Sequence, residues 1–154
     1  MFNMISKDMK RFNHLIGEIE AVYHEISWKQ GLSDSVFEVL YTICNYGDSC
    51  MLKDICHNCG LSKQTVNSAL RKLEKEGIVY LESVDSRHKK VCLTEAGKSL
   101  AGRTAGAVIE AENEILASWS KEEVETYIAL TRRYLLALQN KAKNLPEASE
   151  RRMT

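Results

Sequence analysis

Residues 55–93 constrain the fold of this chain more than any other stretch. Gly60 can supply the left-handed backbone conformation that ends a helix, here a short one over residues 52–59. Ser62 offers a side-chain oxygen to the free backbone N–H groups of a second helix, over residues 63–76. Two helices joined by so short a turn predict a helix-turn-helix.

A β-hairpin is predicted directly after the second helix. Gly77 ends that helix, and two runs of β-branched and apolar residues follow at 78–81 and 90–93. The polar residues 85–90 form the predicted loop between them. We therefore expect a mainly α fold with a small β-hairpin wing, that is, a winged helix-turn-helix with further helices around it.

Amphipathic helices are predicted on both sides of this unit. Apolar residues recur at helical spacing over residues 4–29 and again over 95–118, where Thr94 can act as the N-cap. Ser120 and Glu123 form a capping box that begins a last helix. The residues of that helix that we expect to face inward are Val124, Tyr127, Ile128, Thr131, Tyr134, Leu135 and Leu138.

Composition limits the class of protein. With 154 residues, 44% of them hydrophobic, the chain can bury a core. Five cysteines without an apolar export segment, and no apolar run that could span a bilayer, favour a cytoplasmic protein with no membrane contact. The formal net charge is zero, but residues 52–103 carry ten Lys or Arg against six Asp or Glu, while the rest carries eleven against fifteen. A basic segment on an acidic body suits a protein that meets phosphate groups with one face.

The outer side of the predicted helix 63–76 carries side chains that can read DNA. Gln and Asn can bond two atoms of adenine, Arg and Lys can bond two atoms of guanine, and the Thr methyl can contact thymine. The residues concerned are Lys63, Gln64, Thr65, Asn67, Ser68 and Arg71, with Ser62 at the cap. A solvated surface helix has a similar composition, so this helix alone leaves both interpretations open.

The predicted loop places cations beside that helix. Arg87, Lys89 and Lys90 lie within four residues, with His88 between them, and cations at a loop tip can enter a narrow minor groove. Asp85 is expected to fix either the Arg87 side chain or the turn itself. An ordinary charged hairpin is the alternative.

Residues 62–79 resemble the recognition helix and first wing strand of the MarR family of bacterial transcription regulators. Asp85-Ser86-Arg87 and Leu93-Thr94-Glu95-Ala96-Gly97 are similar to the wing signature of that family, and Leu32-Ser33 is similar to the start of its second helix. The resemblance covers about residues 5–143.

The resemblance implies a homodimer that binds double-stranded DNA at a pseudo-palindromic operator, as a repressor released by a ligand or by oxidation. We expect an N-terminal dimerisation helix over residues 1–31, a DNA-binding winged helix-turn-helix over 32–93, C-terminal dimerisation helices over 94–145 and a disordered tail over 146–154. The expected DNA-binding residues are Ser62, Lys63, Gln64, Thr65, Asn67, Ser68 and Arg71 of the recognition helix and Asp85, Arg87, His88 and Lys89 of the wing.

A thiol- or metal-responsive sensor is the alternative function. Cys56 and Cys59 have the spacing of half a zinc site, but no second pair is present, so both are interpreted as core residues and no metal or cofactor is expected. Cys50, which the sequence places in a turn, is the best candidate for a redox switch because such a thiol must be partly exposed.

The sequence does not identify the residues that bind an effector. Aromatic residues that could line a pocket for a small lipophilic or phenolic effector, although such rings more often belong to a core, are Trp28, Tyr41, Tyr46, Trp119, Tyr127 and Tyr134. No nucleophile elbow, P-loop or dinucleotide-binding motif is present, so no enzymatic activity is expected. A protein–protein adaptor that uses the same fold without DNA is a further alternative.

Overall fold

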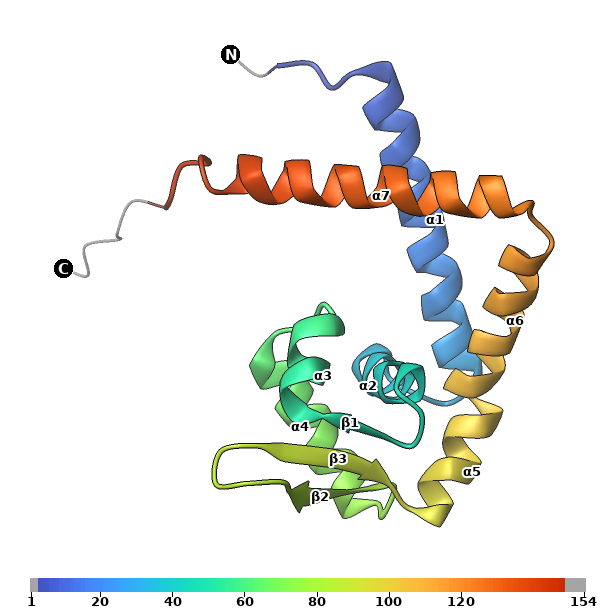
Figure 1. Ribbon diagram of the computed structural model, residues 1–154, viewed down its shortest axis with the longest axis vertical. Helices are drawn as coiled ribbons and strands as arrows, with labels where there is room; N and C mark the ends of the chain where they lie inside the picture. Colours follow the sequence, from blue (N-terminus) through green and yellow to red (C-terminus); the bar gives the residue numbers. More distant parts are fainter. Residues whose placement is uncertain (1–2, 149–154) are drawn as a thin grey trace. The chain divides into compact units, whose positions relative to one another are not determined.

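A computed structural model describes residues 3–148 and divides the chain into two compact units, Met1–Glu110 and Ala111–Thr154 (Figure 1). The elements in chain order are α1 (Lys7–Lys29), α2 (Asp34–Asn45), β1 (Ser49–Met51), α3 (Leu52–Asn58), α4 (Lys63–Lys75), β2 (Val79–Ser83), β3 (Lys89–Leu93), α5 (Glu95–Arg103), α6 (Ala105–Ala117) and α7 (Lys121–Ala142). The mainly α fold with a small β wing is therefore confirmed.

Local capping sets the helix ends. The residues whose hydroxyls accept a hydrogen bond from the backbone N–H three positions later are Ser6, Ser33, Ser62, Thr94 and Ser120. After α1, α3 and α4 the chain turns at glycines with positive φ, which are Gly31 (73°), Gly60 (71°) and Gly77 (71°). Helix α4 thus begins after Ser62, and α3 and α4 end before Gly60 and Gly77, as the sequence predicted. The start of α3, after Met51, has no side-chain cap.

The sheet has one strand more than predicted. Its order is β1-β3-β2, and both pairings are antiparallel, with Cys50 opposite Val91 in one and Val79 opposite Leu93 in the other. Cys50, in the middle of β1, was expected to lie in a turn. The residues of β1 are extended because the edge of β3 pairs with them, and that partner lies about forty residues further along the chain.

The core of the first unit lies between α2, α3, α4 and the sheet. Leu40, Ile43, Ile55, Leu73 and Val91 are completely or almost completely buried there. This packing fixes α4 and the β2–β3 hairpin relative to each other, because both contribute side chains to one core.

A single helix was expected over residues 95–118, but Thr104 separates α5 from α6. Its backbone departs from helical values (φ −119°, ψ −97°), and its main-chain carbonyl accepts a hydrogen bond from Gln30 Nε2 at 3.3 Å. Gly97, earlier in the same stretch, lies so close to the main-chain carbonyl of Ile78 that a Cβ would collide with it, whereas the space beside Gly102 is open. Close approach therefore accounts for Gly97 and not for Gly102.

The second unit differs from its prediction in burial. Its capping box is present, because Ser120 Oγ accepts from the Glu123 N–H and the Glu123 carboxylate accepts from the Ser120 N–H. However, α7 contains no buried residue, so the expectation that its apolar side faces inward is wrong for the single chain. The large apolar residues exposed on α7 include Tyr127, Ile128, Leu130, Tyr134, Leu135, Leu136 and Leu138.

The predicted tail over residues 146–154 falls largely on 149–154, which lie outside the described residues. Among the residues that are described, none of the helices combines the length and the apolar character needed to cross a membrane.

Candidate nucleic-acid interface

The N-terminus of α4 is held by its cap. Ser62 Oγ accepts the backbone N–H of Thr65 at 3.1 Å and lies 2.7 Å from Thr65 Oγ1. The turn before it is fixed by Gly60 and by the half-buried Leu61, which packs against the core. The first turn of α4 is therefore held firmly at the surface.

The two sides of α4 differ sharply. Its buried residues are Val66, Ala69, Leu70 and Leu73. On the other side, Lys63, Gln64, Ser68 and Arg71 are exposed, and Thr65 and Asn67 are partly exposed. All of the side chains expected to read DNA are accessible, with no acidic residue among them.

Asp85 organises the wing loop. Its Oδ1 accepts the backbone N–H groups of Arg87 at 2.8 Å and His88 at 2.9 Å, and the ring Nδ1 of His88 lies 2.8 Å from the same carboxylate. The bond from the Arg87 backbone, followed by the bond from the His88 ring, lowers the pKa of Asp85. Of the two roles expected for Asp85, the structure shows fixation of the turn, which leaves the Arg87 side chain exposed.

The wing loop is shorter than predicted. Lys89 was assigned to it, but Lys89 belongs to β3, where it pairs with Ser83. Lys90, which was assigned both to the loop and to the strand, also lies in β3. Lys89 is exposed, whereas Lys90 is half-buried with its Nζ 3.6 Å from Glu82 Oε2. Lys90 is therefore engaged within the sheet, and Arg87 and Lys89 are the more accessible cations of the wing.

A hollow of about 800 Å³ separates the wing loop from α3 and the start of α4. Lys63, Arg87, His88 and Lys89 line it together with two α3 residues that the sequence analysis had not singled out, Lys53 and His57. These two are four residues apart and exposed, so they lie one turn apart on the same side of α3. That spacing is the sequence signal that points to them.

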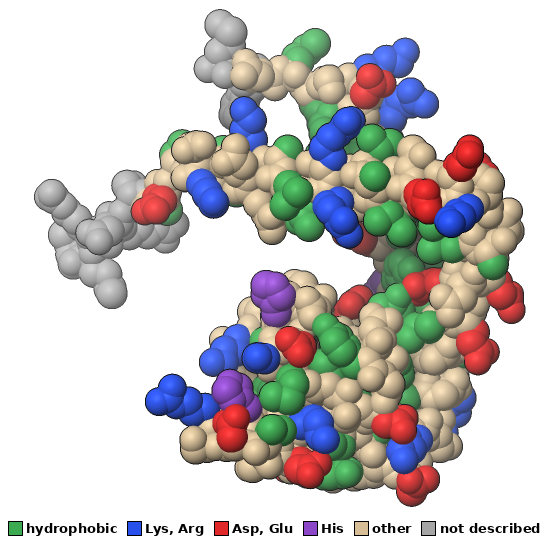
Figure 2. Space-filling model, in the orientation of Figure 1, with side chains coloured by type: hydrophobic (Ala, Val, Ile, Leu, Met, Phe, Trp, Pro, Cys, Tyr) green, Lys and Arg blue, Asp and Glu red, His purple; other side chains and the backbone are tan. Residues whose placement is uncertain are grey.

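Figure 2 shows how these charges are distributed on one face of the molecule. Lys, Arg and His side chains gather where the β2–β3 loop and α3 lie in Figure 1. The outer face of α4, the wing and the exposed side of α3 all belong to the first compact unit. They form a basic surface on a single packed body.

The three cysteines considered for redox or metal chemistry, Cys50, Cys56 and Cys59, lie in the core or pack against it. Cys50 lies in β1 and not in a turn, it is buried, and burial followed by the charge of Asp54 raises its pKa to about 11. Its expected role as an exposed redox switch is therefore wrong. Cys59 is buried in the core and Cys56 packs against it. Within residues 3–148, no three His, Cys, Asp or Glu side chains are grouped so that they could hold a metal ion.

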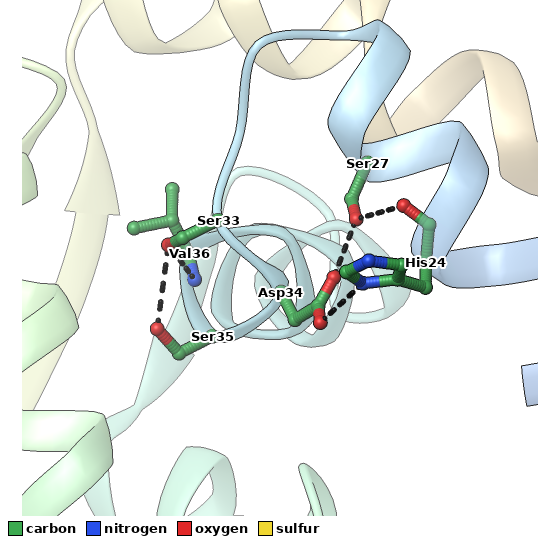
Figure 3. Close-up of polar contacts among 6 residues, drawn as sticks. All are labelled: His24, Ser27, Ser33, Asp34, Ser35 and Val36. Atoms are coloured by element: carbon green, nitrogen blue, oxygen red, sulfur yellow. Dashed lines mark hydrogen bonds and ion pairs between the residues drawn. The ribbon is translucent and has the colours of Figure 1, made fainter. Parts of the chain in front are cut away.

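A polar cluster joins α1 to α2 (Figure 3). Asp34 accepts from the Ser27 hydroxyl at 2.6 Å, and its other oxygen lies 2.7 Å from His24 Nδ1. The hydrogen bond from Ser27, followed by that from His24, lowers the pKa of Asp34. Because the serine hydroxyl contacts the carboxylate and not the imidazole ring, the cluster lacks the nucleophile–base contact of a hydrolase. It serves as a link between the first two helices.

The same architecture is found in solved structures of MarR-family regulators. A MarR family regulator from Neisseria meningitidis, NMB1585, superposes with a TM-score of 0.75 at 22% sequence identity, covering 91% of this chain and 100% of the other. The Staphylococcus aureus regulator MepR in complex with DNA has a TM-score of 0.63 at 22% identity, with coverages of 88% and 99%. NadR in complex with 4-hydroxyphenylacetate has a TM-score of 0.62 at 16% identity, with coverages of 87% and 96%.

Sequence comparison gives a result for the winged-helix region. No curated protein matches the chain. Residues 30–90, however, match the sequence profile of the MarR family, and they contain α2, β1, α3, α4, β2 and the start of β3. The winged-helix region of the chain is therefore similar in sequence to the MarR family, and the chain has the fold of solved MarR-family structures.

Proposed function

We propose that this protein is a sequence-specific DNA-binding transcription regulator of the MarR type. The observation that carries the proposal is the basic surface of the first unit, where the exposed side of α4 and the wing cations Arg87 and Lys89 belong to one packed body. In a helix-turn-helix the second helix enters the major groove with its first residues against the base edges. Here Lys63, Gln64, Asn67 and Arg71 are the side chains available for base contacts, and Arg87 is the side chain available for the minor groove.

We further propose that the protein acts as a homodimer on a pseudo-palindromic operator. The support is apolar surface exposed in the single chain: on α1, Leu15, Ile19 and Val22 are 59%, 47% and 55% exposed, and on α7, Ile128 and Leu135 are 47% and 50% exposed. Patches of this kind usually mark a protein–protein interface. A dimer would present two α4 helices about 34 Å apart, which is one turn of DNA.

Repression that is released by a small lipophilic or phenolic effector completes the proposal. A cleft of about 330 Å³ lies between α1 and α2, where Tyr23, Phe37 and Leu61 contribute apolar surface beside polar and acidic side chains such as Glu20 and Glu38. Clefts lined by apolar side chains with a few polar groups are the usual sites of small ligands. The ring carried by 4-hydroxyphenylacetate, the compound bound to NadR, makes it a suitable first probe.

The proposal is tested by selecting genomic fragments that bind the purified protein. We expect enrichment of a pseudo-palindromic sequence, with an affinity that falls steeply as salt increases, because phosphate contacts release counterions. The double variant Lys63→Ala/Arg71→Ala should lose the enrichment, whereas Lys29→Ala at the end of α1 should keep it. Failure to enrich any sequence, or an affinity that does not respond to salt, would contradict the proposal.

The direction of regulation needs a separate measurement. A reporter gene placed behind the selected sequence should be less active when the protein is present and should recover when an effector is added. Higher reporter activity in the presence of the protein would show an activator instead.

A further inference from the structure

The hollow between α3 and the wing is lined in part by charged residues that are not among the proposed base contacts. Lys53 and His57 line it from α3, and Lys63 lines it from the first turn of α4. Both α3 side chains are exposed, and they belong to the helix that precedes α4, so they lie outside the set of α4 side chains proposed to contact bases. We therefore expect a different binding partner for Lys53 and His57.

The opposite wall of the hollow is the wing. Arg87, His88 and Lys89 line it, together with one carboxylate, that of Asp85, whose oxygens are bonded to His88 and to backbone N–H groups of the loop. The remaining titratable group among the lining residues is the half-buried thiol of Cys56. Both walls of the hollow therefore present a surplus of positive charge.

The geometry of duplex DNA supplies the missing partner. One sugar-phosphate strand forms the ridge between a major groove and the neighbouring minor groove. If α4 occupies the major groove and Arg87 the minor groove, the strand between them passes between the start of α4 and the wing loop. The hollow adjoins that path, because Lys63 and the wing residues line it together with α3. Positive side chains on both sides of a phosphate strand position a protein without reading sequence.

We propose that this hollow is a phosphate clamp, in which Lys53 and His57 of α3 hold one DNA strand from the side opposite Arg87 and His88, and that protonation of the two imidazoles tightens the clamp. The inference rests on the proposed DNA-binding function and adds to it two contact residues on α3 and a dependence of affinity on pH.

The electrostatics give the direction of the pH effect. Histidine is the side chain that ordinarily changes charge between pH 5 and 8. Protonated His57 would add a positive charge beside Lys53 and Lys63, and protonated His88 would neutralise Asp85, with which it is in contact at 2.8 Å. Both changes make the hollow more positive as pH falls. Because linkage is reciprocal, a bound phosphate strand should in turn favour proton uptake.

The test uses the full chain and a 30-base-pair duplex of mixed sequence, because phosphate contacts do not depend on sequence. Binding is measured by fluorescence anisotropy over a salt series at pH 7.8 and at pH 5.8. We expect affinity at 0.1 M salt to be at least about fivefold higher at pH 5.8, and the slope of log affinity against log salt to steepen by about one to two, because each added phosphate contact contributes about 0.9.

Substitutions assign the effect to residues. His57→Gln and His88→Gln should each remove part of the pH dependence, and the double variant should remove it. Lys53→Gln should weaken binding about five- to tenfold at both pH values and reduce the slope by about 0.9, as expected for one lost contact. The matched controls are His14→Gln and Lys29→Gln on α1, outside the hollow, and both should behave like the wild type. Circular dichroism melting of every variant checks that the fold is retained.

The possible failures can be told apart. Equal salt slopes at the two pH values for the wild type, or a pH effect that survives the double histidine variant, would overturn the clamp while leaving DNA binding intact. A wild-type protein that binds no duplex even at low salt would overturn the proposed function itself.

Discussion

Helices α4 and α7 begin in the same way, but their apolar sides lie in opposite environments. Each starts after a serine whose hydroxyl accepts the third backbone N–H, and each carries apolar residues at helical spacing. In α4 those residues are buried beneath α2 and the sheet, whereas α7 buries none of its residues. The comparison shows that periodicity determines which side of a helix is apolar, while the rest of the chain determines whether that side is covered.

The largest expected difference between the two helices is in stability. Leu73→Ala, at a position that is 1% exposed, should lower the free energy of unfolding by about 2–5 kcal/mol, because it leaves a cavity in the core. Leu135→Ala on α7 is the matched variant, and its effect should depend on protein concentration because it removes surface assigned to the dimer. Urea denaturation at several concentrations separates the two. A large effect of Leu135→Ala that does not change with concentration would break the comparison.

The second difference concerns assembly. Ile128→Asp combined with Leu135→Asp should convert the proposed dimer into monomers, because two charges would be placed in an apolar contact. Light scattering measures the change in mass, and circular dichroism should still show a folded winged-helix unit. Gln139→Asp, also on α7, serves as the control and should remain dimeric. A double variant that stays dimeric would place the interface elsewhere.

DNA affinity should respond to substitutions in the wing and not to those on α7. Arg87→Ala is expected to weaken operator binding about tenfold or more, since charged groove contacts contribute about 1–3 kcal/mol. The dimer should persist, so light scattering and anisotropy on the same sample distinguish this variant from the α7 double variant. Unchanged affinity at moderate salt would remove Arg87 from the interface.

A pair of glycines tests close packing inside the first unit. Gly97→Ala should destabilise the protein by about 1–3 kcal/mol, because the new methyl group would meet the main-chain carbonyl of Ile78. Gly102→Ala, with open space beside it, should stabilise the protein by up to about 1 kcal/mol through higher helix propensity. Thermal unfolding of both variants measures the difference, and the same sign for both would contradict the structure.

The smallest expected effect is at the caps. Ser62→Ala should lower stability by about 1 kcal/mol through the loss of the hydrogen bond from Thr65. Ser120→Ala, which breaks the capping box of α7, should have an effect of similar size. Hydrogen exchange localises each loss, which should appear in the first turn of the affected helix. A loss spread over the whole chain in both variants would mean that the two regions unfold together.

Those parts of the fold that depend on near neighbours were predictable from the sequence. Ser33, Ser62 and Ser120 set helix starts, and Gly60 and Gly77 set helix ends, because each acts on backbone groups within a few residues. The three residues of β1 could not be assigned in this way. Their strand conformation depends on pairing with Lys90, Val91 and Cys92, which only the folded chain brings alongside them.

The candidate site followed the same rule. The outward residues of α4 and the role of Asp85 in a turn are local properties, so sequence reasoning located them. Lys53 and His57 were not assigned to the interface because α3 was interpreted from its buried side, and because the hollow they line exists only once the wing folds beside that helix. Cys50 was misplaced for the same reason, since its burial depends on the unpredicted strand.

The break at Thr104 has a mechanical consequence. Its carbonyl oxygen accepts a hydrogen bond from the side-chain amide of Gln30, the C-cap residue of α1. This hydrogen bond connects the end of α1 to the break between α5 and α6. If the end of α1 moved, the hydrogen bond between Gln30 and Thr104 would either break or move Thr104 with it. A displacement of the C-terminal end of α1 would therefore act on Thr104, the residue that separates α5 from α6.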